Sequence, residues 1–389
     1  MKTFCSYYNS GTCLSCNRIE EDYSTQVEQK QQKLQTLLTP FLPFEHLAPV
    51  TSVPTGFRNK AKLSITGTVE RPVIGLLGEK DLDQGREILE CLVHHPKVNE
   101  ILQALPEFIK ASSLQPYQIK QRTGELKGAI VYYSSETEEL YLRVILRSKE
   151  SLDRIKKHSA LLLEKFPKLT CFSANIQPVP HAILEGEEEI FFTTQKFINH
   201  NLSGVPMTLH PQGFVQTNQE VALKLYATAA DWVREIAPLK FMELFSGQGA
   251  FSFFIQKFVK EAIGVEINPE AVERANLTAK ELGWNHLRFI AMDASVVQKM
   301  ISDFNPEVIL VNPPRRGLAQ ACELLKSVES EYFIYSSCNA ETLAQDLLVL
   351  KDHFKVVKVQ VFDMFPNTDH FETLVLLRSL TACENGSSL

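Results

Sequence analysis

The C-terminal half of the chain alternates short apolar runs with helical stretches, and most of the runs end in polar residues. A helical stretch ending near residue 236 precedes the first run, and residues 354–378 predict two more strands around a connection. This alternation predicts a doubly wound parallel sheet, whose ligands bind at the carboxyl ends of the strands. The five predicted strands of this alternation are 241–245, 262–265, 287–291, 308–311 and 333–335.

The residues that follow these strands carry the candidate chemistry. Gly247 and Gly249 follow the first strand, where glycine lets the backbone approach a ligand and the next helix presents its positive dipole end. Glu266 ends the second strand about 20 positions later, where an acid accepts hydrogen bonds from ribose hydroxyls. Cys338 follows the fifth strand and is the best nucleophile candidate, although a free cysteine is more often a small buried hydrophobe. The third and fourth strands end at Asp293 and Asn312.

The middle of the chain changes to short strands mixed with two predicted helices, 96–112 and 149–166. Alternate residues of a strand share one face, so several cations are expected on one face of an antiparallel sheet. Such a face either binds RNA phosphates or is simply solvated, and the sequence does not choose between these interpretations. The cations are Arg58, Lys60, Lys62, Lys127, Arg143 and Arg147.

Length and charge set limits on the class of protein. A chain of 389 residues is long enough for two or three domains, each with its own core. Its net charge of −6 argues against a generally cationic nucleic-acid binder but allows a local basic patch. There is no apolar run long enough to span a bilayer and no signal-peptide core, so we expect a cytoplasmic protein with reduced or metal-bound cysteines.

Cysteines cluster near the N-terminus, in a loop rich in turn-forming residues. Three thiols on one loop usually bind a metal, and a four-coordinate site needs a fourth ligand. Cys91 is the nearest further thiol and completes the set for an iron–sulfur cluster, whereas His94 or His95 would complete a zinc site. The spacing does not decide between the two metals. The three thiols of the loop are Cys5, Cys13 and Cys16.

Three motifs, in this order, make a family resemblance specific: N-P-P-R-R-G, Y-S-S-C-N and D-M-F-P-x-T-x-H-x-E-T. Together they resemble the S-adenosylmethionine-dependent RNA uracil-5-methyltransferases. The N-terminal cysteines and the stretch G-F-R-N-K-A-K are similar to the bacterial 23S rRNA (uracil(747)-C(5))-methyltransferase subgroup. The resemblance covers nearly the whole chain and leaves out only about the last ten residues.

The resemblance implies a role for each matching residue. Cys338 would be the nucleophile and Glu372 the general base, while Cys5, Cys13, Cys16 and Cys91 would bind a 4Fe–4S cluster. The residues matching positions that contact S-adenosylmethionine are Gln216, Phe245, Glu266, Asp293 and Asn312. Three positions depart from the pattern of many relatives: Ser246 replaces a cysteine, Asn312 replaces an aspartate, and leucine follows Cys91 where proline is expected.

The resemblance also implies a domain plan within an α/β chain. Residues 1–47 would form a cysteine-rich iron–sulfur segment and residues 48–205 a central α+β RNA-binding region. Residues 206–381 would form a Rossmann-like class I S-adenosylmethionine-dependent methyltransferase domain, and residues 382–389 a loose tail. The implied partner is 23S rRNA, with no membrane or DNA partner, and the protein is expected to be a monomer.

The sequence leaves alternatives open for the general base, the target uridine and the reaction. His370 is also a possible general base, since histidine is the commonest one, and Asp363 is expected to be structural. One alternative is 5-methylation of another rRNA uridine or of a tRNA uridine. Another S-adenosylmethionine-dependent RNA methylation, such as one on an amino group, would need no cysteine nucleophile. A non-catalytic RNA-binding iron–sulfur protein would leave Cys338 and Glu372 unexplained.

Overall fold

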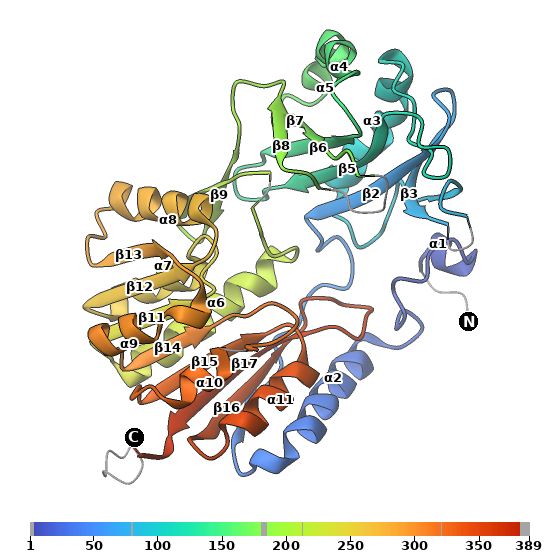
Figure 1. The fold of residues 1–389 in the computed structure, drawn as a ribbon. Helices are drawn as coiled ribbons and strands as arrows, with labels where there is room; N and C mark the ends of the chain where they lie inside the picture. The colour runs from blue at the N-terminus through green and yellow to red at the C-terminus, as the bar shows by residue number, and fades with distance from the viewer. Residues whose placement is uncertain (1–3, 79–80, 180–184, 212, 320, 382–389) are drawn as a thin grey trace. The chain divides into compact units, whose positions relative to one another are not determined.

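The chain forms two compact units, each with its own sheet. The computed structural model describes residues 4–78, 81–179, 185–211, 213–319 and 321–381 (Figure 1). The first unit consists of Met1–Glu20, Val53–Asn201 and Thr208–Gln219, and the second of Glu21–Ser52, Leu202–Met207 and Glu220–Leu389.

An eight-stranded sheet forms the centre of the second unit, in the order β1-β16-β17-β15-β14-β11-β12-β13. The strands from β11 to β15 pair in parallel, and β17 runs antiparallel to both β15 and β16. The predicted Rossmann-like fold is therefore confirmed, and the last two predicted strands extend the sheet beyond β15. The bounds are β1 (Glu45–His46), β11 (Lys240–Leu244), β12 (Glu261–Glu266), β13 (Leu287–Ala291), β14 (Val308–Val311), β15 (Tyr332–Ser337), β16 (Phe354–Phe362) and β17 (Glu372–Ser379).

Helices cover both faces of this sheet and bury two apolar clusters. One cluster joins the sheet to α2 (Tyr23–Leu38), α9 (Gln298–Phe304), α10 (Ala321–Lys326) and α11 (Ala340–Leu350). The other joins it to α6 (Gln219–Ile236), α7 (Ala250–Ile255) and α8 (Pro269–Glu281). Burying the apolar face of each helix against the sheet is the main stabilising term for such a layered unit. Short 3₁₀ turns lie at Thr39–Phe41, Gln256–Phe258 and Ala294–Val296.

The first unit is an α+β layer around a seven-stranded sheet in the order β4-β3-β2-β5-β6-β7-β8. All neighbours pair antiparallel except β6 and β7. The strands are β2 (Lys60–Gly67), β3 (Pro72–Leu77), β4 (Gly85–Glu87), β5 (Leu126–Tyr133), β6 (Leu140–Leu146), β7 (Leu169–Ile176) and β8 (Glu188–Phe191). The helices are α1 (Ser6–Asn9), α3 (Pro96–Ala111), α4 (Leu152–His158) and α5 (Ala160–Lys165), and a hairpin of β9 (Ile198–Leu202) and β10 (Val205–Leu209) completes the chain's elements.

The predicted helices of the first unit are largely confirmed. The helix expected at 96–112 is α3, while the stretch 149–166 forms two helices, α4 and α5, that meet at Ser159. This pair connects the parallel strands β6 and β7, a connection that needs a crossover segment.

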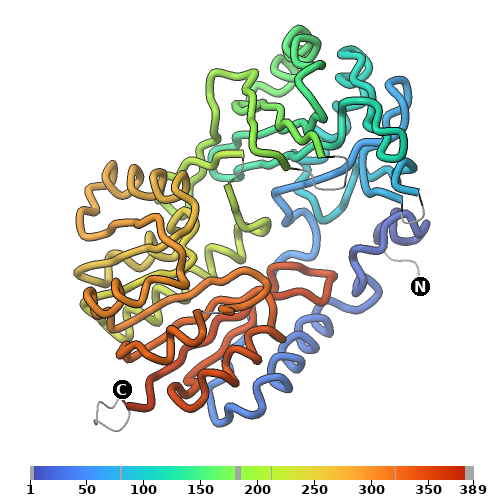
Figure 2. Tube along the Cα trace, in the orientation of Figure 1, coloured from blue at the N-terminus to red at the C-terminus, as the bar shows by residue number. Residues whose placement is uncertain are grey.

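The expected segment 1–47 is divided between the two units after Glu20. The blue helix α2 and strand β1 lie beside the red C-terminal elements, as Figure 2 shows, and β1 pairs in parallel with β16. Helix α2 buries Leu34 and Leu38 in the core of the second unit. This helix is therefore part of the unit that carries Cys338, not an extension of the cysteine loop. In the described part of the chain, no helix is both long and apolar enough to cross a bilayer.

Candidate active site

The register of the sheet brings Cys338 and Glu372 together. Strands β15 and β17 run antiparallel with Ser337 opposite Thr373, so the next pair along this register is Cys338 and Glu372. Glu372 also lies opposite Phe362 of β16. It is 3% exposed, whereas Cys338 is half-buried. The two residues expected to act on one base therefore lie on neighbouring strands of one sheet.

The surroundings of this pair favour the protonated forms of both groups. Burial raises the pKa of Glu372 to about 8, and the nearby charge of Arg315 lowers it in part. Burial raises the pKa of Cys338 as well, and the charge of Glu372 raises it further. A carboxyl group with a pKa near neutrality is suited to accept a proton during a reaction, because a general base works best near its own pKa.

Arg315 is a residue of this site that the sequence analysis did not single out. Its positive charge lowers the pKa of the Cys338 thiol and so opposes the effects of burial and of Glu372. Its carbonyl oxygen accepts hydrogen bonds from Asn339 Nδ2 at 3.3 Å and from Thr342 Oγ1 at 3.2 Å. The available signal was its position, as the first arginine of N-P-P-R-R-G.

The backbone after Cys338 is held in a fixed shape by helix capping. Asn339 is the N-cap of α11, and its Oδ1 accepts hydrogen bonds from the backbone N–H groups of Glu341 and Thr342 at 3.1 and 3.3 Å. Ser337 Oγ donates to the Asn339 carbonyl at 3.0 Å. The thiol therefore lies just before the positive end of a helix, which favours a negative sulfur atom.

The glycine turn after β11 is shaped for a ligand. Gly249 has a φ of +86°, and a Cβ atom there would lie 2.4 Å from the Phe289 ring, so only glycine fits. Gly247 N–H donates to Glu266 Oε2 at 2.9 Å, and the other carboxylate oxygen accepts from Asn268 N–H at 3.0 Å. These two bonds fix the orientation of the Glu266 carboxylate at the end of β12.

Four of the five predicted donor-site residues lie at the carboxyl ends of adjacent strands. Phe245 and Asn312 are half-buried after β11 and β14, and Asn312 N–H donates to the Leu244 carbonyl at 3.3 Å. Asp293 follows β13 and is exposed, and its Oδ1 accepts from Ser295 N–H at 2.8 Å, which lowers the pKa of this carboxyl. With Glu266 they line one edge of the sheet. Gln216 belongs to the first unit, so its part in this site stays a sequence prediction.

Comparison with known proteins identifies the family. The model of the tRNA (Uracil-5-)-methyltransferase family matches residues 22–380. The chain belongs to this family. The RNA uracil-5-methyltransferase resemblance of the sequence motifs is thereby confirmed.

Curated relatives match the methyltransferase along nearly all of its length. The 23S rRNA (uracil(747)-C(5))-methyltransferase RlmC of Proteus mirabilis is 40% identical over 96% of this chain and 98% of its own. The protein of the same name from Haemophilus influenzae (strain PittGG) is also 40% identical, over 96% and 98% of the two chains. The Pyrococcus abyssi tRNA (uracil-54, C5)-methyltransferase, solved with S-adenosyl-L-homocysteine, is 24% identical with a TM-score of 0.78 and covers 94% of this chain and 86% of its own. That likeness shows the shared fold.

The four predicted metal-binding cysteines of the methyltransferase all belong to the first unit. Burial raises the pKa of Cys16 to about 12, and the other three thiols raise it further by their charges. The histidines of the zinc alternative have other contacts: His94 Nδ1 is 3.2 Å from Asn99 Oδ1, and the His95 ring stacks on Tyr133. Among the described residues, however, no three Cys, His, Asp or Glu side chains are arranged so that they could bind a metal ion. Four thiols are the ligand type of an iron–sulfur cluster, so the cluster stays a sequence prediction that this arrangement does not support.

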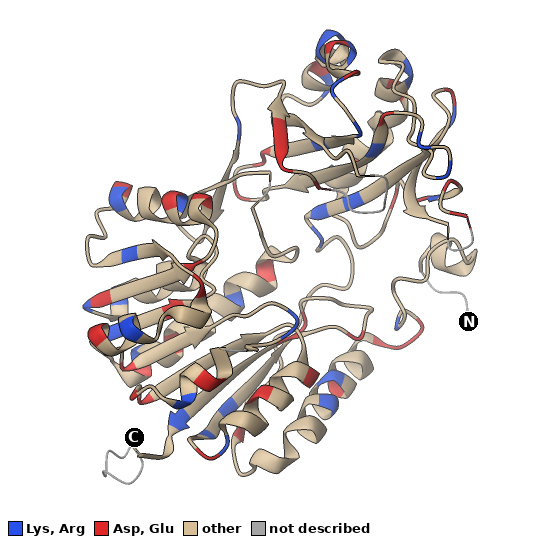
Figure 3. Cartoon of the chain, viewed as in Figure 1, with Lys and Arg blue, Asp and Glu red and all other residues tan. Residues whose placement is uncertain are grey.

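Most cations of the predicted basic strand face form ion pairs or hydrogen bonds within the first unit. Arg143 is fully buried and pairs with Glu185 at 2.9 Å and with Glu189. Lys62 pairs with Glu185, and Lys127 donates to two backbone carbonyls. Figure 3 shows the acidic residues of β8 in the same sheet as the basic positions of β2. Few cations of this face are therefore unpaired, which weakens its interpretation as a surface that binds RNA phosphates.

Proposed function

We propose that this methyltransferase transfers the methyl group of S-adenosylmethionine to carbon 5 of uracil 747 in 23S rRNA. The observation that carries the proposal is the pairing of Cys338 with Glu372 across β15 and β17. The relatives that are about 40% identical along 96% of the chain carry this activity in their names. A 23S rRNA substrate also means that the protein works in the cytoplasm.

The reaction needs one nucleophile and one base on the uracil ring. The Cys338 thiolate adds to ring carbon 6, and the ring's double-bond electrons move to form an enolate. Carbon 5 then attacks the methyl group of the second substrate, S-adenosylmethionine, whose sulfur–methyl bond breaks so that S-adenosylhomocysteine leaves. Glu372 removes the proton from carbon 5, the bond between sulfur and carbon 6 breaks, and the thiolate is regenerated.

Arg315 has two effects in this scheme. Its positive charge stabilises the Cys338 thiolate, which is the form that attacks the ring. Its charge also limits how far burial raises the pKa of Glu372, so the carboxylate stays accessible near neutral pH. Because its carbonyl is held by Asn339 and Thr342, the residue is fixed to the same turn as the nucleophile.

The four residues at the strand ends bind the methyl donor. Each Glu266 oxygen has one bond to a backbone N–H and keeps a free lone pair for a ribose hydroxyl. Ile267 and Val296 follow β12 and β13 and are 67% and 66% exposed, which is unusual for branched apolar residues. They supply an apolar surface for the adenine ring, and Gln216 is proposed to contact the donor as well.

A 4Fe–4S cluster on Cys5, Cys13, Cys16 and Cys91 is a second part of the proposal. The support is the donor set, because four thiolates are the usual ligands of such clusters. Bound thiolates would replace four neutral thiols and tie the N-terminal loop to the segment before α3. The role of the cluster in this proposal is structural.

The decisive experiment maps 5-methyluridine in 23S rRNA from cells with and without the gene. Loss of the modification at position 747 alone, with its return on incubation with purified protein and S-adenosylmethionine, would support the proposal. Since the family model is named for tRNA, tRNA from the same cells is mapped in parallel. Loss at a tRNA uridine, with position 747 unchanged, would overturn the rRNA assignment.

A further inference from the structure

A cavity of about 740 Å³ lies entirely within the first unit. It is formed by the first turns of α3, the end of β5, the start of β6 and the connection from α5 to β7. Tyr133 and Leu140 are buried at its base, and Phe166 is half-buried at its wall. Its volume is in the range of small-molecule sites and is sufficient for one nucleotide.

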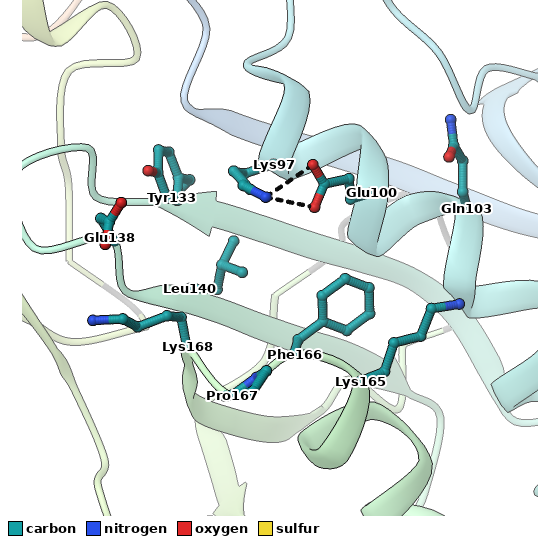
Figure 4. A pocket seen from close by; sticks show the side chains of 10 residues that line it. All are labelled: Lys97, Glu100, Gln103, Tyr133, Glu138, Leu140, Lys165, Phe166, Pro167 and Lys168. Atoms are coloured by element: carbon teal, nitrogen blue, oxygen red, sulfur yellow. Dashed lines mark hydrogen bonds and ion pairs between the residues drawn. The ribbon is translucent and has the colours of Figure 1, made fainter.

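The charges around this cavity differ from those on the strand face. Lys97 is held by Glu100, with Nζ at 3.0 and 2.9 Å from the two carboxylate oxygens. Lys165 and Lys168 have no ion pair among the described residues, and Lys165 Nζ lies 5.9 Å from the centre of the Phe166 ring. Figure 4 shows Leu140 and Phe166 between these two lysines. The cavity therefore combines an apolar floor with two unpaired cations on opposite sides.

An exposed acidic residue also lies beside the cavity. Glu138 is exposed beside the cavity, in the turn between β5 and β6, with no ion pair among the described residues. A carboxylate repels a phosphate but accepts a hydrogen bond from the imino N–H of an unpaired uracil or guanine. An RNA nucleotide has a flat base with one phosphate on each side, which matches an apolar surface between two lysines.

We propose that this cavity binds one unstacked uridine or guanosine of the RNA substrate, at a point separate from the methylated base. The base lies on Phe166 and Leu140, Glu138 accepts its imino N–H, and Lys165 and Lys168 contact the flanking phosphates. The inference rests on the proposed function only in taking RNA as the substrate. It gives the first unit an RNA contact that does not use the paired cations of its strand face.

The test compares two lysine pairs in the full-length protein. Lys165→Ala/Lys168→Ala removes the two cations at the cavity, and Lys156→Ala/Lys157→Ala removes two exposed lysines of α4 as a matched control. Binding of an rRNA fragment that contains the target loop is measured by fluorescence anisotropy at several salt concentrations. Each lost phosphate contact lowers the slope of log affinity against log salt by about 0.7 for a single strand, so the cavity variant should lose about 1.4. We expect at least about a tenfold loss of affinity, a raised KM, and a kcat within about twofold of the wild type. Equal affinities for the cavity variant and the control would overturn the proposal.

Glu138→Ala separates base recognition from simple attraction of phosphate. A cavity that only attracts phosphate would bind RNA more tightly without this negative charge, whereas a cavity that reads an imino group would bind it more weakly. Weaker binding by about threefold or more supports the proposal, and tighter or equal binding contradicts it. Methylation by the wild-type protein is measured in the same samples. Absence of methylation there would refute the proposed function, while normal methylation with unaffected variants would refute only the cavity's role.

Discussion

The helix α2 contains a lysine whose removal should destabilise the catalytic unit strongly. Lys30 Nζ lies 2.7 Å from Asp363 Oδ1 and 3.1 Å from the Phe365 carbonyl oxygen. The two charged side chains are 2% and 0% exposed. Lys30→Met keeps a similar side-chain length but leaves the Asp363 carboxylate buried without its cation. Breaking a buried pair in this way costs about 3–5 kcal/mol, a large share of the roughly 5–15 kcal/mol that stabilises a typical domain.

The same helix provides the control. Lys33 pairs with Glu341 at 2.6 Å, but these side chains are 44% and 52% exposed. Because solvent screens an exposed pair, Lys33→Met should cost less than about 1 kcal/mol. The comparison keeps the residue type, the helix and the substitution constant and changes only the burial of the ion pair.

Urea unfolding followed by tryptophan fluorescence measures the loss of stability in the second unit, to which α2 belongs. The chain has two tryptophans, and both Trp232 and Trp284 belong to the second unit. The midpoint for Lys30→Met should fall much further than that for Lys33→Met, and the double variant Lys30→Met/Asp363→Leu should recover part of the loss. A loss for Lys30→Met no larger than the loss for Lys33→Met would refute the argument from burial. Methylation should fall as well, because Asp363 begins the connection that leads to Glu372.

Four further predictions concern the proposed chemistry and the cluster. Cys338→Ala should abolish methyl transfer while calorimetry shows S-adenosylmethionine binding nearly unchanged, and turnover above background would contradict the nucleophile assignment. Glu372→Gln should stall after methylation and accumulate a covalent RNA adduct on denaturing gels, whereas normal turnover without an adduct would point to another base. Folding raises the pKa of Glu372 from 4.5 to about 8, so the stability of the folded protein should fall as pH rises from about 4.5 to about 8; an unchanged unfolding midpoint over this range would contradict that sign. Cys16→Ser should lower iron content and RNA affinity but not donor binding, and zinc without iron or labile sulfide in the anaerobically purified protein would refute the cluster.

The sheet of the second unit was predictable because its signals are local. Each parallel strand is a short buried apolar run, and the polar residues that follow mark the edge where ligands bind. That rule correctly placed Glu266, Asp293 and Asn312 at one edge. Local signals do not specify the pairing of Cys338 with Glu372. It depends on the antiparallel return of β17 beside β15, which is a long-range strand pairing.

The attachment of α2 could not be predicted for the same reason. Its sequence is rich in Gln, and Gln26 and Lys30 would be assigned to a solvated face. In the structure both are buried because their partners come from the far end of the chain: Gln26 Oε1 accepts from Asn367 N–H at 2.8 Å, and Lys30 pairs with Asp363. A buried polar side chain is stable only when its partner is in place, so its burial is a property of the fold and not of the helix.

The raised pKa values of Cys338 and Glu372 suggest the order of events in the proposed mechanism. Each negative charge raises the pKa of the other group, so a thiolate and a carboxylate are unfavourable there at the same time. Attack by Cys338 therefore occurs while Glu372 is protonated, with Arg315 compensating the charge on sulfur. Once the sulfur is bonded to carbon 6 it is neutral, and the obstacle to an ionised Glu372 is removed. The carboxyl can then lose its proton to solvent and take the proton from carbon 5. The same coupling works in reverse at the end, because the protonated Glu372 allows the sulfur to leave as a thiolate.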